Sequence, residues 1–284
     1  MAMDILQEMN ITEASDVFIT LGRDAPDSIH IHFFILNFII WSEYTDAVDM
    51  HFYCPHGNSR DGSVYAIARF KNGPTFITFH CVDLHFDYIL KHLNETKIID
   101  WNEDIIFEAI HEKFTPILRI IIAEKKLKIV NEDVVHQVWL NYHKRKEMLV
   151  LVPDPLYIAP MRKREFKFIK QNWEYYSSEL EPVINTTLEN NCVIGLYHRS
   201  NDSLMGWAVE QHFGGIGMLY VLEEYRNQGY GATIIQAMCH RMIDRQIDPY
   251  AFIHINNSRS LALFEKVGFK KINLAHWVHT IKSR

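Results

Sequence analysis

One short segment restricts the fold of this chain more than any other: an apolar run that leads into an Arg-x-x-Gly-x-Gly loop. The run spans residues 219–222, the loop spans residues 226–231, and a helical pattern begins near Ala232. Glycine adopts backbone conformations that a Cβ penalises, so Gly229 and Gly231 let the backbone approach a ligand closely. The start of a helix presents unpaired N–H groups and the positive end of the helix dipole. The segment therefore predicts an anion cradle that suits a pyrophosphate.

Two other glycine-containing phosphate-binding patterns do not fit this loop. A Walker A loop requires a lysine directly after its last glycine, and no lysine follows Gly231. The dinucleotide-binding fingerprint requires a third glycine, where this sequence has Ile234. The spacing argues against both.

A second motif lies downstream at a compatible distance. Residues 257–269 read Asn-x-x-Ser-x-x-Leu-Phe-x-x-x-Gly-Phe, a pattern for a strand end, a helix and a returning strand. The loop and this segment together resemble the two motifs of the GNAT acyltransferase superfamily. The Trp-Ala-Val strand at residues 207–209, the Glu-Tyr-Arg step at 224–226 and the Asp27-Ser28 pair before an apolar helix are similar to the glycine N-acyltransferase-like branch. The resemblance is strong over residues 150–284 and loose before them.

The length of 284 residues favours two domains, and the apolar fraction of 48% is typical of a globular chain. Three prolines between residues 153 and 160 mark a boundary. We therefore expect a mixed α/β, α+β-like protein with an N-terminal domain at residues 1–152 and a domain of GNAT fold at residues 153–284. A degenerate copy of the GNAT fold is one interpretation of the N-terminal domain.

In the N-terminal half, two β-branched and aromatic runs at residues 63–70 and 75–81 flank an Asn-Gly turn and predict a hairpin. Helices are predicted at residues 29–41 and from Phe86 onward. The apolar residues from Ile105 to Ile110 predict another helix, and Asn131 is interpreted as the N-cap of a further one.

The resemblance implies a site for acetyl-CoA or a longer acyl-CoA. Backbone N–H groups of the loop would bind its pyrophosphate with added charge from Arg226, and the strand before the loop would separate from its parallel neighbour and pair with the pantetheine. The residues implied to bind the coenzyme are Leu219, Val221, Arg226, Gln228, Gly229, Tyr230, Gly231, Ala232, Asn257 and Phe264.

Direct transfer to an amine needs no protein nucleophile, but it does need a base that takes the proton of the amine. Glu210, His212 and His254 lie near the expected cleft, and His254 and Glu210 are the candidate catalytic residues. A lone polar residue on a strand also commonly serves structure alone. The family places a glutamate where this chain has Gly215 and a tyrosine where it has Phe264, so neither of those roles is carried over.

The composition excludes several other classes of protein. A net charge of −6 argues against nucleic acid as the main partner. The 16 histidines form no His-Glu-x-x-His or zinc-like pattern, so no metal site is expected. The apolar segment at residues 29–41 is shorter than the ~20 residues that span a bilayer. The N-terminal residues are acidic and match no transit signal, and the four cysteines are far apart, so we expect a cytoplasmic location, with mitochondria as the alternative.

The sequence thus predicts an acyl-CoA-dependent N-acyltransferase that acts on a small amine or amino acid, with glycine as one candidate acceptor. The departures at Gly215 and Phe264 keep a second interpretation open: a regulatory module that binds acyl-CoA and has weakened chemistry. A protein-lysine acetyltransferase is less favoured. The sequence specifies neither the acyl chain length nor the oligomeric state.

Overall fold

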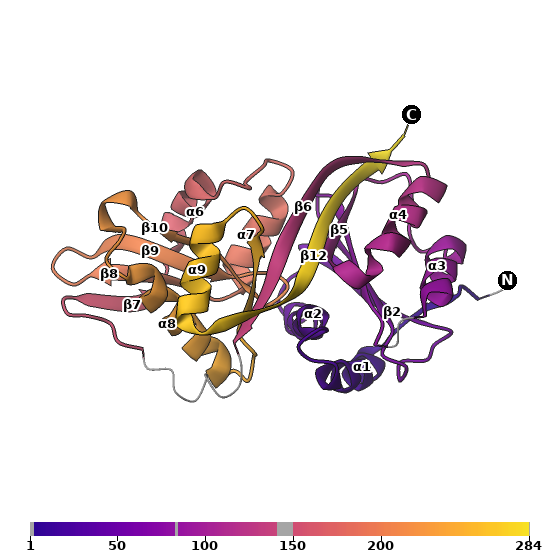
Figure 1. Ribbon diagram of the computed structural model, residues 1–284, viewed down its shortest axis with the longest axis horizontal. Coiled ribbons are helices and arrows are strands. Elements are labelled where there is room, and N and C mark those ends of the chain that lie inside the picture. The colour runs from indigo at the N-terminus through magenta and orange to yellow at the C-terminus, as the bar shows by residue number, and fades with distance from the viewer. Residues whose placement is uncertain (1–2, 83–84, 141–149, 284) are drawn as a thin grey trace. The chain divides into compact units, whose positions relative to one another are not determined.

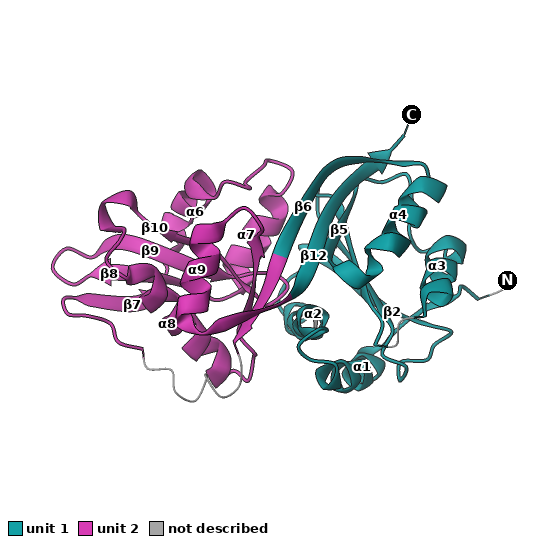
Figure 2. Ribbon diagram, in the orientation of Figure 1, with its two compact units in different colours: residues 1–135, 273–284 teal, residues 136–272 magenta. Residues whose placement is uncertain are grey.

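The computed structural model describes residues 3–82, 85–140 and 150–283 (Figure 1). The chain forms two compact units (Figure 2). Unit 1 consists of residues 1–135 and 273–284, and unit 2 consists of residues 136–272. Each unit combines β-strands with helices, so the predicted mixed α/β class is confirmed.

Unit 2 is built on a meander of strands that ends in a parallel pair. Its strands β7 to β10 pair antiparallel in chain order, and β10 pairs in parallel with β11. The elements are β7 (Leu156–Pro160), α6 (Phe166–Asn172), α7 (Glu181–Asn190), β8 (Val193–His198), β9 (Ser203–Glu210), β10 (Ile216–Val221), α8 (Tyr230–Asp244), β11 (Tyr250–His254) and α9 (Ser258–Val267). The sequence predicted this order from β8 to α9.

Helices cover both faces of this sheet. Trp207 and Val209 of β9 pack in one cluster with Ile169 of α6 and Ile184 of α7. A Cβ on Gly206, the residue before Trp207, would lie 2.9 Å from Ile234 of α8. Because successive side chains of a strand point to opposite faces, α6 and α7 cover one face and α8 covers the other.

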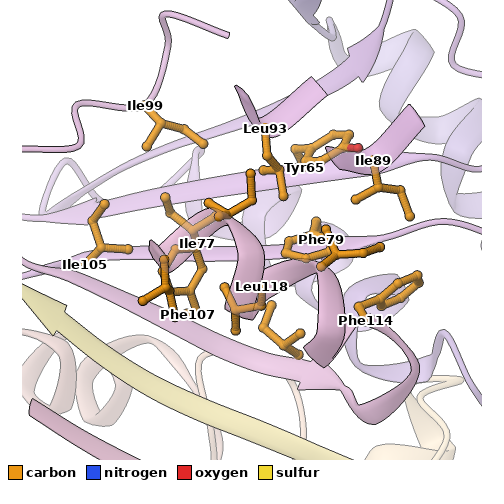
Figure 3. Close-up of a cluster of buried hydrophobic side chains, with 14 of the residues drawn as sticks. Tyr65, Ile77, Phe79, Ile89, Leu93, Ile99, Ile105, Phe107, Phe114 and Leu118 are labelled. Atoms are coloured by element: carbon orange, nitrogen blue, oxygen red, sulfur yellow. The ribbon is translucent and has the colours of Figure 1, made fainter. Parts of the chain in front are cut away.

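Unit 1 repeats this architecture. Its strands β1 to β4 are antiparallel in chain order, and β4 pairs in parallel with β5 from Thr75↔Ile105 to Ile77↔Phe107. The elements are β1 (Leu6–Glu8), α1 (Ile11–Arg23), α2 (Ile29–Trp41), β2 (Val48–Pro55), β3 (Val64–Phe70), β4 (Thr75–His80), α3 (Phe86–Glu95), β5 (Ile105–His111), α4 (Thr115–Glu124) and β6 (Leu127–Leu140). Figure 3 shows its core, in which Ile77 and Phe107 of the sheet pack with Ile89 of α3 and Leu118 of α4.

Both halves of the chain therefore follow the order β-α-α-β-β-β-α-β-α-β, with β6 as the last strand of the first copy and β12 (Phe269–Lys282) as the last strand of the second. The sequence shows no such repeat by eye, because the segment between β4 and α3 reads Cys-Val-Asp-Leu-His and lacks the glycines of the loop between β10 and α8. The fold supports the interpretation of the N-terminal half as a degenerate copy.

Two of the predicted helices are strands. Residues 105–111 form β5, in which every side chain is buried, and the segment after Asn131 belongs to β6. A strand that is buried on both faces reads as a continuous apolar run, which periodicity does not separate from a buried helix.

The last strands connect the two halves of the chain. From Ala275 to Thr280, β12 pairs antiparallel with β5 of unit 1. The end of β6 belongs to unit 2, where Leu140 donates its N–H to the carbonyl of Pro249 of the same unit at 3.0 Å. Residues 273–284 thus belong to unit 1, although the sequence groups them with the domain at residues 153–284, because a strand pattern does not specify which strand it pairs with.

Candidate functional site

Strands β10 and β11 separate almost as soon as they begin to pair. Their register consists of the single pair Ile216↔Ala251. On its other side β10 carries a bulge, since Met218 and Leu219 lie between the pairs Gly217↔Val209 and Tyr220↔Trp207. Met218 adopts a positive φ of 48° at this bulge. A bulge bends its strand and increases the local twist, which turns the rest of β10 away from β11.

The bend exposes backbone groups on one edge of β10. Leu222 donates its N–H to the carbonyl of Met205 at 2.9 Å, so the backbone groups of Leu222 point toward β9. Neighbouring residues of a strand direct their N–H and C=O groups to opposite edges. The N–H and C=O of Val221 therefore point to the edge that β11 has left, and an extended chain could pair there as an added strand.

The loop after β10 has the predicted glycine conformation at Gly229 but not at Gly231, which lies within α8 and has no positive φ. Gly229 lies at φ +83° as the N-cap of α8, and a Cβ at this position would meet nothing within 4 Å. Among the residues that the structure describes, none accepts a hydrogen bond from the N–H groups of residues 228–231. Four adjacent donors at the start of a helix form a site for an anion.

The other predicted coenzyme-binding residues take several positions. The N–H of Ala232 donates to the carbonyl of Gly229 at 3.0 Å and is thus used within the helix. Asn257 caps α9, where its Oδ1 accepts the N–H of Ser260 at 3.0 Å. Phe264 is buried, with its ring edge-on to Phe269 at 4.9 Å between centroids.

Glu210 is fully buried at the end of β9. Its Oε2 accepts a hydrogen bond from Nη1 of Arg245 at 2.6 Å, and Arg245 is the C-cap of α8. Burial raises the pKa of the Glu210 carboxyl, while the Arg245 charge opposes that rise. The pair links β9 to the C-terminal end of α8, the end opposite the glycine loop. No sequence signal pointed to Arg245, because this contact joins residues 35 positions apart.

His254 lies on the other face of the sheet. Glu210 and Ala251 both register with Ile216, and residues in register share a face. Three residues beyond Ala251, His254 projects to the opposite face, where its ring lies 6.3 Å from that of the exposed Tyr175. The structure does not bring the two candidate bases together.

The remaining polar candidates lie in a tightly packed turn. His212 is buried, with its ring edge-on to Phe213 at 5.0 Å. A Cβ on Gly215 would lie 2.8 Å from the ring of Phe213 and 3.1 Å from that of Tyr250. A glutamate at position 215 would have to displace these rings.

Comparison with known proteins bears on this arrangement. The family model described as FR47-like protein matches residues 193–278, which include β10, the glycine loop and α9. No curated protein matches the chain. Among solved structures, a Drosophila protein aligns with a TM-score of 0.85 at 17% identity, over 98% of this chain and 99% of that one.

A tandem GNAT protein from the clavulanic acid biosynthesis pathway aligns with a TM-score of 0.52 at 10% identity, over 97% of this chain and 96% of its own. This chain has the GNAT fold. A GCN5-related N-acetyltransferase from Sphaerobacter thermophilus also aligns, with a TM-score of 0.50 at 11% identity over 99% and 96% of the two chains. The tandem GNAT protein aligns over nearly its whole length with this chain, in which the same order of helices and strands occurs twice.

No helix in the described ranges is long and apolar enough to cross a membrane. Within the same ranges, no three His, Cys, Asp or Glu side chains are arranged to hold a metal ion.

Proposed function

We propose that the chain is an acyl-CoA-dependent N-acyltransferase whose site lies in unit 2. The observation that supports this most is the continuity of two features, the edge of β10 at Val221 that β11 leaves and the N–H groups of residues 228–231, from which no described residue accepts a hydrogen bond. The first suits an extended amide chain and the second suits a pyrophosphate. Acyl-CoA contains both in this order.

The residues of unit 2 would serve direct transfer as follows. The N–H of Val221 would donate to the carbonyl oxygen of the thioester as it gains charge. The amine attacks the thioester carbon, a C–N bond forms, and the C–S bond breaks to release the thiolate. Phe264 has no proton to give, so the thiolate would take one from water, which its ordinary pKa of about 8.5 allows.

His254 is the better placed of the two candidate bases. It lies at the carboxyl end of β11 beside an exposed tyrosine, whereas Glu210 is buried in an ion pair on the face covered by α8. We propose that His254 takes the proton of a small amine or amino-acid acceptor, directly or through water. As the specific acceptor we propose glycine, as in a glycine N-acyltransferase-like enzyme. The acyl donor would be acetyl-CoA or a longer acyl-CoA.

Gly229→Glu tests the cradle. The structure favours this position over Gly231, where a Cβ would lie 2.9 Å from Leu263, because position 229 has open space around it. Gly229→Ala is the matched control, since both changes carry the strain of a positive φ, about 1–2 kcal/mol. We expect calorimetry to show loss of CoA binding in the glutamate variant and a smaller loss in the alanine variant. Equal CoA affinity in the glutamate variant and the native protein, with normal circular dichroism, would refute the assignment.

A second candidate function is a module that binds acyl-CoA without transferring the acyl group. The separation of Glu210 from His254 and the burial of Phe264 favour it. CoA release measured over a panel of acyl-CoAs and amines distinguishes the two. Binding without release across the whole panel would favour the module.

A further inference from the structure

Arg226 does not reach out of the glycine loop but turns back onto β10. Its Nε donates to the carbonyl of Val221 at 3.0 Å, and its Nη1 donates to Oε1 of Glu223, also at 3.0 Å. The guanidinium thus forms a hydrogen bond with the Val221 carbonyl oxygen, which points to the edge of β10 that β11 leaves.

Aromatic stacking holds the guanidinium in this place. Its central carbon lies 5.1 Å from the ring centroid of Tyr220, and the Tyr220 ring stacks on Trp207 with centroids 5.0 Å apart and planes at 20°. Trp207 is 1% exposed and belongs to the core under α6 and α7. A guanidinium over a tyrosine is stabilised by the ring quadrupole, so the contact with Val221 rests on a rigid support.

This contact competes with the ligand of the proposed function. An extended amide chain that pairs with the edge of β10 must donate an N–H to the carbonyl of Val221, which Arg226 already engages. We propose that Arg226 is exchanged for the ligand: it holds the Val221 carbonyl in the free protein, and a ligand amide replaces it there. The released guanidinium then faces the negative charge bound at the neighbouring loop. Arg226 is a positioning residue in this scheme, and the inference rests on the proposed function.

The exchange predicts that loss of Arg226 weakens binding of the phosphates of CoA but favours binding of its pantetheine. The probes are CoA and 3′-phospho-ADP, which retains the phosphates and lacks the pantetheine. In Arg226→Met, the lost charge should weaken binding of both. The Val221 carbonyl is no longer engaged, so the ratio of CoA affinity to 3′-phospho-ADP affinity should rise about tenfold, the worth of one charge-assisted hydrogen bond.

Arg226→Lys separates charge from geometry. It keeps the positive charge but has no Nε–H at this position, so the same ratio should rise while 3′-phospho-ADP binding is retained. Arg199→Met is the matched control: it removes an arginine that is 62% exposed on the β8–β9 hairpin and should leave the ratio unchanged.

The outcomes are distinguishable. If the native protein binds neither nucleotide, the proposed function fails and the exchange fails with it. If the native protein binds both and neither Arg226 variant changes the ratio, the exchange is wrong although CoA binding stands. A merely structural role of Arg226 would lower both affinities by the same factor and would likewise overturn the exchange.

Discussion

The α1–α2 side of unit 1 buries three histidines near two aspartates, and this cluster predicts a specific sensitivity to acid. His80 is fully buried and its Nε2 lies 2.7 Å from Oδ2 of Asp24, while His111 lies 3.8 Å from Asp27. Burial lowers the pKa of His80, lowers that of His30 further, and with the Lys113 charge lowers that of His111 to about 4. The three histidine rings of this cluster are therefore uncharged in the folded chain at neutral pH.

The sign of the effect follows from the direction of these shifts. A histidine whose pKa is lower in the folded state than in the unfolded state stabilises the fold above its unfolded pKa of 6.5, and this stability is lost as pH falls below that value. For His111, with a folded pKa of about 4, the loss between pH ~7.5 and pH ~5 is at most about 2 kcal/mol. Asp24, whose pKa is lowered from 3.8 mainly by its contact with His80 against the effect of burial, titrates below this window.

His111→Asn isolates the contribution of one ring. The Nδ1 of His111 accepts the N–H of Lys113 at 3.0 Å, and an asparagine oxygen can replace it as that acceptor. Urea unfolding of the native protein and the variant at the two pH values should show that the variant loses about 2 kcal/mol less on acidification. His51, whose pKa is raised by Glu8 and Asp49 despite burial, acts in the opposite direction, but it cancels in this comparison. Equal losses in the two proteins would refute the reasoning.

Three further predictions concern unit 2. Arg245→Met leaves the buried Glu210 carboxylate without its partner and should cost about 3 kcal/mol in urea unfolding, which the double variant with Glu210→Leu should largely recover; an unchanged midpoint in the single variant would contradict the ion pair. His254→Gln should lower turnover by about 10²-fold and remove the acidic limb of the pH–rate profile at unchanged CoA affinity, and retention of both would exclude His254 as the base. Gly206→Ala places a Cβ 2.6 Å from the carbonyl oxygen of Tyr220 and should destabilise the fold by about 1–3 kcal/mol, whereas a neutral effect would mean that β10 shifts freely.

The C-terminal half was predictable because its signals are local. The loop conformation depends on Gly229, and the start of α9 depends on the side-chain cap of Asn257, so both are specified within a few residues. The order of elements from β8 to α9 follows from such signals together with the alternation of apolar residues.

The features that the sequence did not predict depend on register and on distant partners. Whether Glu210 and His254 share a face is decided by the pairs that Ile216 makes with its two neighbouring strands. The sequence suggested that Arg226 adds charge to the cradle, but the stacking on Tyr220 that turns it toward Val221 is a matter of three-dimensional packing. The sequence predicts a helix from Ile105 to Ile110, where the structure has strand β5, because a strand whose side chains are all buried has the same continuous apolar pattern as a buried helix.

The pairing of β12 with β5 has a consequence for the order in which the chain folds. Thr280 donates its hydroxyl to the carbonyl of Ile105, a contact between residues 175 positions apart. Unit 1 therefore cannot complete its sheet during synthesis until all of unit 2 has been made, and the edge of β5 stays open until then. Contacts of such long range slow folding and leave an unpaired strand exposed to other chains. We expect a fragment cut at residue 152 to aggregate, because it contains β5 without the strand that covers it.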